Sequence, residues 1–161
     1  MSAPLAAYLN EHLAGAMVAI DLAGKAADRN RGSRLGVFLS ELREAIDEDR
    51  ETLEKIIERL GVERGGVKAT AGRVVEKVSR LRLHEKVTGD PDLSRVLELE
   101  TLIMGVTGKV RLWHSLQESL ASDPRLAGVD LDVLVRRGHE QLAGLDDHHR
   151  EAAARAFAAA G

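Results

Sequence analysis

One carboxylic acid occupies a position where the surrounding residues predict burial. Between residues 35 and 60, apolar side chains recur at alternating intervals of four and three, and Asp49 belongs to that series. The series is Leu35, Leu39, Leu42, Ile46, Asp49, Leu53, Ile56 and Leu60. This spacing places its members on one face of a helix that packs against other helices. A carboxylate on that face must be ion-paired, hydrogen-bonded, protonated or metal-bound, because burying a bare charge costs too much free energy.

Two other polar side chains are predicted to lie at the height of Asp49. The helix before Asp49 and the helix that holds it form an antiparallel pair around residue 31, and His12 and Asp49 lie 19 and 18 residues from that point. Lys109 lies at a similar depth in a later helix that runs parallel to the Asp49 helix. We therefore predict a structural polar core of His12, Asp49 and Lys109. A contact with Asp49 would raise the proton affinity of His12.

A second set of polar side chains could bind a metal ion. Glu100 is predicted to lie about 10 Å above Asp49, at the height of His149. Asp146 and His149 are three residues apart and share one helical face. The candidate ligands for a divalent transition metal (iron, manganese or zinc) are Asp49, His12, Glu100, Asp146 and His149. An ammonium group from Lys109 counts against a metal, because it neutralises the carboxylate and repels cations.

Other site chemistries lack their residues in this sequence. There is no cysteine, no Gly-x-Ser-x-Gly motif and no glycine-rich phosphate loop ending in Gly-Lys-Ser/Thr. The four aromatic residues are too few for a base-stacking platform, and the net charge of −3 gives no general attraction to nucleic acid. We expect a non-catalytic protein that does not bind nucleic acid.

Composition favours one cytoplasmic domain. The length of 161 residues suits a single domain with its own core, over residues 1–161, and 44% hydrophobic with 30% charged residues is typical of a globular chain. No apolar run approaches the roughly 18 residues that a membrane span needs. The absence of cysteine fits a reducing compartment, and the first residues lack the basic region of a signal peptide.

The residue periodicity predicts five helices and no strands. Their approximate ranges are 4–30, 34–60, 67–83, 91–120 and 130–159, with a loop over 122–129. The first helix has two candidate inner tracks, either Leu9, Leu13, Ala16, Ile20, Ala23 and Ala27, or Leu5, Leu9, His12, Ala16, Ala19 and Ala23. The fourth helix is apolar on nearly every face, so we expect it to be the most buried.

Charge is segregated along the chain. Residues 41–58 hold eight acids and three basic residues, whereas residues 64–86 hold seven basic residues and two acids. The basic strip is Arg73, Lys77, Arg80 and His84. It either pairs with the acidic helix of the same chain or meets an acidic partner, such as another subunit. Alanine-rich helix faces together with this segregation favour a homo-oligomer, with a dimer as the expected state.

Two pairs of long helices joined by a crossover helix resemble the ferritin-like superfamily. The segments YLNEHLAGA at 8–16, EDRETL at 48–53 and LELE at 97–100 are similar to those of bacterial ferritin-like proteins. The resemblance implies a four-helix bundle with residues 67–83 as the crossover. Its diiron members would carry two Glu-x-x-His pairs, but Asp146 is the only acid that stands three residues before a histidine here. A standard diiron site and its oxidase chemistry are therefore not expected.

Three functions follow from these predictions. The first is a non-catalytic bundle in which a buried ion network replaces the metal site. The second is a protein that stores, senses or oxidises a divalent metal. The third is a carrier with an apolar cavity between the first and last helices, which would bind a lipid or an isoprenoid.

Overall fold

Four α-helices dominate the part of the chain that the computed structural model describes, residues 2–63 and 89–158. They are α1 (Ala3–Arg29), α2 (Arg34–Arg59), α4 (Pro91–Leu120) and α5 (Leu131–Ala158), and a short 3-10 helix, η1 (Pro124–Leu126), lies between α4 and α5. No strand occurs in these residues, so the prediction of an all-helical chain is confirmed for them. The helix predicted over residues 67–83 and its basic strip lie outside the described residues.

Local sequence signals fix the helix ends. The Ser33 hydroxyl accepts a hydrogen bond from the Gly36 amide at 3.1 Å and caps the start of α2. The Asp90 carboxylate accepts from the amides of Asp92 and Leu93, and a proline begins α4 directly after it. Residues 124–126, predicted to be loop, instead form η1, because the Asp123 side chain caps the turn that a proline opens.

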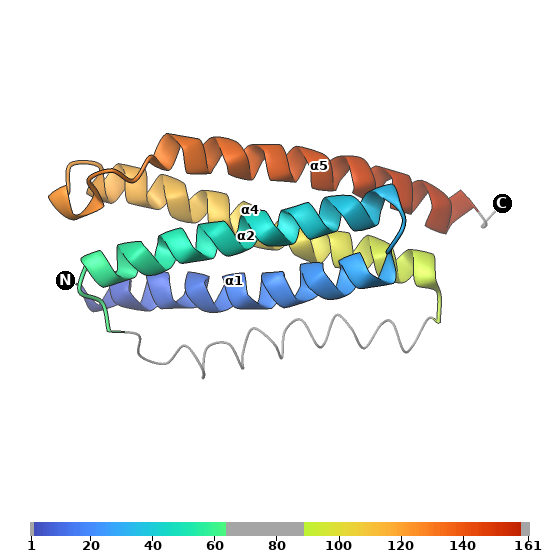
Figure 1. Ribbon diagram of the computed structural model, residues 1–161, viewed down its shortest axis with the longest axis horizontal. Helices are drawn as coiled ribbons and strands as arrows, with labels where there is room; N and C mark the ends of the chain where they lie inside the picture. Colours follow the sequence, from blue (N-terminus) through green and yellow to red (C-terminus); the bar gives the residue numbers. More distant parts are fainter. Residues whose placement is uncertain (1, 64–88, 159–161) are drawn as a thin grey trace.

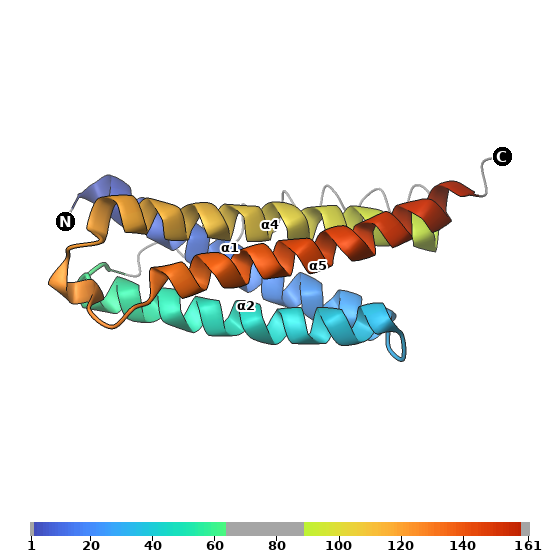
Figure 2. The same ribbon diagram turned by 90° about the horizontal axis from the view of Figure 1, so that it is seen from above.

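The four helices form two antiparallel hairpins. In Figure 1, α1 and α5 run in one direction, and α2 and α4 run in the other. Figure 2 shows the second hairpin lying along the first, so that α4 contacts α1 and α5 contacts α2. The end of α2 and the start of α4 therefore lie at opposite ends of the bundle. This is the direction that the sequence analysis required for Lys109 to reach the height of Asp49.

The hydrophobic core consists of two clusters with a polar layer between them. The cluster near η1 includes Leu9, Leu13, Leu53, Ile56, Leu112, Trp113, Leu116 and Leu134. The cluster near the turn between α1 and α2 includes Leu22, Ala23, Leu39, Leu42, Ile46, Leu99, Val106 and Leu145. On α2, the first cluster begins at Leu53 and the second ends at Ile46, and Asp49 lies between them. The buried acid therefore marks the boundary between two apolar regions.

The predicted inner faces agree with the structure to different degrees. Every member of the α2 series is buried except Leu35, which is partly exposed. On α1 neither predicted track is buried as a whole; the buried residues are Leu9, Asn10, Leu13, Ala14, Leu22, Ala23 and Ala26. The expectation that α4 is the most buried helix is wrong, because eight of its 30 residues are buried, against eight of 26 on α2. Its apolar residue Met104 is 59% exposed.

Candidate functional site

Asp49 lies in the interior, and both of its carboxylate oxygens are held by cations. The residue is 2% exposed. The Lys109 ammonium of α4 donates to Oδ2 at 2.5 Å, and the Arg137 guanidinium of α5 donates to Oδ1. Charge-assisted hydrogen bonds of this kind are what a buried carboxylate needs to stay ionised. The structure thus brings Asp49 and Lys109 together and adds a third residue that the sequence analysis did not name.

Helix α5 completes this group, which we call the buried ion cluster: Asp49, Lys109, Arg137 and Gln141. The Gln141 side-chain oxygen accepts from Lys109, and Arg137 also donates to the surface acid Glu48 at 2.8 Å. Arg137 and Gln141 are four residues apart, so they share one face of α5. Gly138 lies at the same level, and a Cβ there would come within 2.5 Å of Val110 Cγ2. The missing side chain lets α5 approach α4 closely at the cluster.

A signal for these two residues was present in the sequence. The inward face of α5 contains Leu134, Gly138, Gln141 and Leu145, all of them buried, with Arg137 beside them. Gln141 therefore interrupts an apolar series in the same way as Asp49 does on α2. Asp146 and His149 were predicted to be the functional residues of α5. Their face of the helix lies about one third of a turn from the face that holds Arg137 and Gln141.

Positive charge exceeds negative charge inside the cluster. Asp49 is the single buried anion, and it faces both Lys109 and Arg137. Burial lowers the pKa of Lys109, an effect that the Asp49 charge opposes and the Arg137 charge strengthens. Among the described residues, Arg137 Nε and Gln141 Nε2 are buried donors that find no acceptor. The cluster is therefore short of acceptors, and its second anion is the surface acid Glu48, which pairs with Arg137 and not with Lys109.

His12 lies near the cluster but does not join it. Its ring packs edge-on against Tyr8, with 4.6 Å between centroids, and in the described part of the chain the hydrogen bonds to the Asp49 carboxylate come from Lys109 and Arg137. Burial lowers the pKa of His12, with a smaller opposing effect from Glu11. This direction is the opposite of the one predicted for a His12–Asp49 contact. Lys109 and Arg137 occupy the two oxygens that His12 would have needed.

The second predicted layer forms a pair at the surface. His149 Nε2 lies 3.1 Å from Glu100 Oε1, and the Glu100 side chain is 49% exposed. Glu100 lies at the flank of α4 because the buried track of that helix runs through Leu99 and Leu102. Asp146 is exposed, and its backbone oxygen accepts from Arg150 at 3.3 Å, so it does not extend the pair.

The residues present do not fit a diiron centre. Within residues 2–63 and 89–158, no group of three or more His, Asp or Glu side chains is close enough to hold a metal ion together. The interior position that a metal would need is occupied by an ammonium and a guanidinium, which repel a cation. Glu100 and His149 supply two ligands, fewer than the four or more that transition metals take.

A cavity of about 250 Å³ lies next to the cluster, between α1, α2 and α4. Its apolar or small lining residues are Gly15, Ala16, Ala19, Ile46, Leu53, Met104, Gly105, Val106, Gly108, Leu112 and Trp113. Its polar lining residues are Glu11, His12, Asp49, Arg50 and Lys109. The sequence analysis expected a cavity between the first and last helices, but α5 does not line this one. Small residues on α1 and α4 create the space on the opposite side of Asp49 from α5.

In the described part of the chain, none of the helices combines the length and apolarity that crossing a bilayer requires. Comparisons with models of protein families, with characterised proteins and with solved structures gave no match for this chain.

Proposed function

We propose that this protein is a non-catalytic, ferritin-like helical bundle in which the buried ion cluster takes the place of a metal centre. Two antiparallel hairpins whose middle helices run in parallel support the ferritin-like assignment, because that topology needs one long connection between the hairpins. The cluster lies at mid-height in the bundle interior, where side chains from facing helices build cofactor sites in such folds.

One observation carries this proposal: each oxygen of Asp49 is already bound by a protein cation. A metal cation next to Lys109 and Arg137 would add a third positive charge around Asp49, and the two protein cations would repel it. The arrangement instead suits a structural role. It ties α2, α4 and α5 together at one height and so disfavours slippage of one helix along another.

The stability of Asp49→Ala tests the structural role. Removing the carboxylate leaves Lys109 and Arg137 buried without their shared anion, and we expect a loss of about 3–5 kcal/mol in the free energy of unfolding, measured by urea denaturation. Asp147→Ala is the matched control, since Asp147 is an exposed acid of α5 that pairs with Arg150 on the surface. Its loss should stay below about 0.5 kcal/mol. Equal losses in the two variants would contradict the proposal.

Metal binding is the second candidate, and the Glu100–His149 contact is the observation that favours it. Elemental analysis of protein purified from rich medium separates the two candidates. We expect iron, manganese and zinc well below one ion per chain in both the wild type and Asp49→Ala. A stoichiometric transition metal that disappears in Asp49→Ala would overturn the structural proposal, and one that disappears only in His149→Ala would place the metal at the surface pair.

A further inference from the structure

The space beside the buried ion cluster is not explained by helix packing. Gly15 and Gly105 both line the cavity, and a Cβ built at either position meets no atom within 4 Å. Glycine inside a helix costs about 1 kcal/mol relative to alanine, so these two positions lose stability without gaining a close contact. Gly138 differs, because a Cβ there would come within 2.5 Å of Val110. Gly15 is partly buried and Gly105 is exposed, so the two glycines keep the cavity open toward the surface, where larger residues would fit.

The size and walls of the cavity suit a small apolar molecule. An apolar cavity of about 150 Å³ accepts benzene, and this one measures about 250 Å³. Ile46, Leu53 and Leu112 supply aliphatic surface along it. On the benzene scale that volume holds about ten non-hydrogen atoms, as in an acid of eight carbons and two oxygens.

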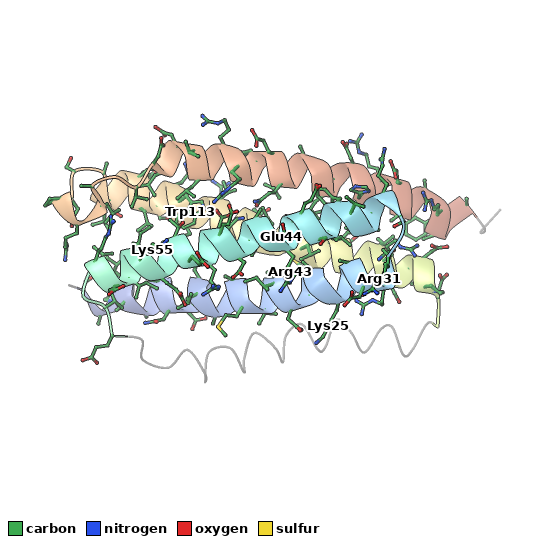
Figure 3. All side chains as sticks on the ribbon, in the orientation of Figure 1. Lys25, Arg31, Arg43, Glu44, Lys55 and Trp113 are labelled. Atoms are coloured by element: carbon green, nitrogen blue, oxygen red, sulfur yellow. The ribbon has the colours of Figure 1, made fainter. Side chains whose placement is uncertain are left out.

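Two hydrogen-bond donors along the cavity lack acceptors. Trp113 is 1% exposed, and its Nε1 is buried with no acceptor among the described residues; Figure 3 shows this residue among the helices. Lys109 has three ammonium hydrogens, and two of them donate to Asp49 and Gln141. The remaining ammonium hydrogen can serve a ligand oxygen, whereas the indole N–H is covered by protein atoms and has no surface toward the cavity. Buried polar groups are normally hydrogen-bonded, so an unpaired ammonium hydrogen beside a cavity points to a ligand acceptor.

The charges around the cavity select the kind of acceptor. Asp49 is shared between Lys109 and Arg137, and the other partner of Lys109 is the neutral amide Gln141. Arg137 has Glu48 as a second anion at the surface, so an anion in the cavity would give Lys109 a second anion as well. Among the other charged lining residues, Arg50 already pairs with Asp47 and Glu54, and Glu11 is exposed to solvent, which screens it.

We propose that the cavity binds a small monocarboxylic acid with an aliphatic body of medium length, its carboxylate beside Lys109 and its chain along α1. This proposal goes beyond the structural role of the buried ion cluster. The binding experiments below can support or refute it whether or not that structural role is correct. The bound carboxylate would be the second anion of Lys109. The apolar body would occupy the space that Gly15 and Gly105 leave open.

Octanoate and 1-octanol are the two probes that test the proposal, because they share an aliphatic chain and differ in charge. Trp113 is the single tryptophan of the chain, so its fluorescence reports directly on the cavity wall. We expect saturable octanoate binding that shifts the Trp113 emission, at least about tenfold tighter than 1-octanol, because a charge-assisted hydrogen bond is stronger than a neutral one. Absence of saturable octanoate binding, or equal affinity for both probes, would overturn the proposal.

Two variants locate the binding. Lys109→Met keeps the bulk of the side chain and leaves Asp49 paired with Arg137, and it should reduce the octanoate affinity at least about tenfold while 1-octanol affinity stays the same. Gly15→Leu, at a partly buried lining position, should fill the cavity and abolish binding of both probes, in a protein that still folds because a Cβ there meets no atom within 4 Å. Ala143→Leu, at an exposed position of α5, is the matched control and should bind both probes as the wild type does. Octanoate binding that neither Lys109→Met nor Gly15→Leu weakens would place the site elsewhere and contradict the proposal.

Discussion

At the scale of single residues, the acids of α2 show how strongly position decides chemistry. The side chain of Asp49 is 1% exposed, whereas that of the adjacent Glu48 is 67% exposed. Consecutive helical residues point about 100° apart, which is enough to carry one carboxylate into the core and leave the next in water. Arg137 bridges the two, since it donates to both. The same residue type therefore serves as a buried anchor in one position and as a solvated charge in the next.

The burial of Asp49 was predictable from its neighbours, but its full set of partners was not. An acid within a Leu and Ile series indicates a compensating group, and helix heights identified Lys109. Heights alone could not distinguish His12 from Arg137, because both lie near the level of Asp49. Side-chain reach and charge decided between them: a guanidinium makes stronger contacts with a carboxylate than an imidazole whose charged form burial disfavours.

Two histidines give the stability of this protein a pH dependence. Burial is the main cause that lowers the pKa of His12 and of His148, opposed by Glu11 at His12 and by Glu151 and Asp147 at His148. The unfolded chain therefore takes up protons first as the pH falls below the ordinary histidine value of 6.5. Proton uptake by the unfolded state favours unfolding. The free energy of unfolding should therefore decrease as the pH falls from about 7 to about 5. Above pH 7 these two histidines should leave the free energy of unfolding unchanged.

Urea denaturation at several pH values checks this prediction. The double variant His12→Gln with His148→Gln should lose less stability than the wild type over the same interval. His139→Gln, at an exposed position of α5, serves as the control and should follow the wild type. If the double variant and the wild type gave parallel curves, the two buried imidazoles would not be the groups responsible.

At the scale of helices, the ends were easier to predict than the faces. The bounds of α4 at Pro91 and Leu120 follow from an aspartate cap, an initial proline and a following polar turn. Its inner face was harder to predict, because the sequence of a helix that is apolar on most sides does not indicate which side faces the core. Met104, for example, is apolar but exposed. The alanine-rich α1 was ambiguous for a related reason, since alanine fits both buried and exposed positions.

The glycines of α4 and α5 provide a prediction at this scale. Gly105→Ala should raise the free energy of unfolding by about 0.5–1 kcal/mol, because alanine favours the helix and its Cβ meets open space. Gly138→Ala should lower it by about 1–3 kcal/mol, because its Cβ would press on Val110 where α5 approaches α4. The two substitutions are chemically identical, so thermal or urea unfolding of the pair isolates packing from helix propensity. Changes of the same sign in both would contradict the assignment of open space at Gly105.

At the scale of the whole molecule, the polar layer divides one bundle into two apolar regions. The cluster near η1 and the cluster near the turn between α1 and α2 meet at the height of Asp49, and the cavity lies at the same level. The sequence predicted the bundle, the direction of its helices and one buried charge within it. It could not predict the cavity, because an empty volume depends on how side chains from three helices fill the space together.

The position of the buried ion cluster also explains why it can specify the fold. Two apolar regions alone would tolerate a shift of one helix by a turn, since leucine and isoleucine contacts are similar at each register. A shift by one turn, about 5.4 Å, would separate Asp49 from both Lys109 and Arg137 and leave the buried carboxylate without a cation. The cluster therefore contributes more to the choice of one register than to the total stability.

A double-mutant cycle between Asp49 and Lys109 tests the central claim most directly. The free energies of unfolding of Asp49→Ala, Lys109→Met and the double variant are measured by urea denaturation and compared with the wild type. If the two groups compensate each other inside the bundle, the double variant will lose less stability than the sum of the single losses, by at least about 1 kcal/mol. Losses that add without any coupling would mean that Asp49 and Lys109 do not form a buried pair, and the cluster would lose its structural role.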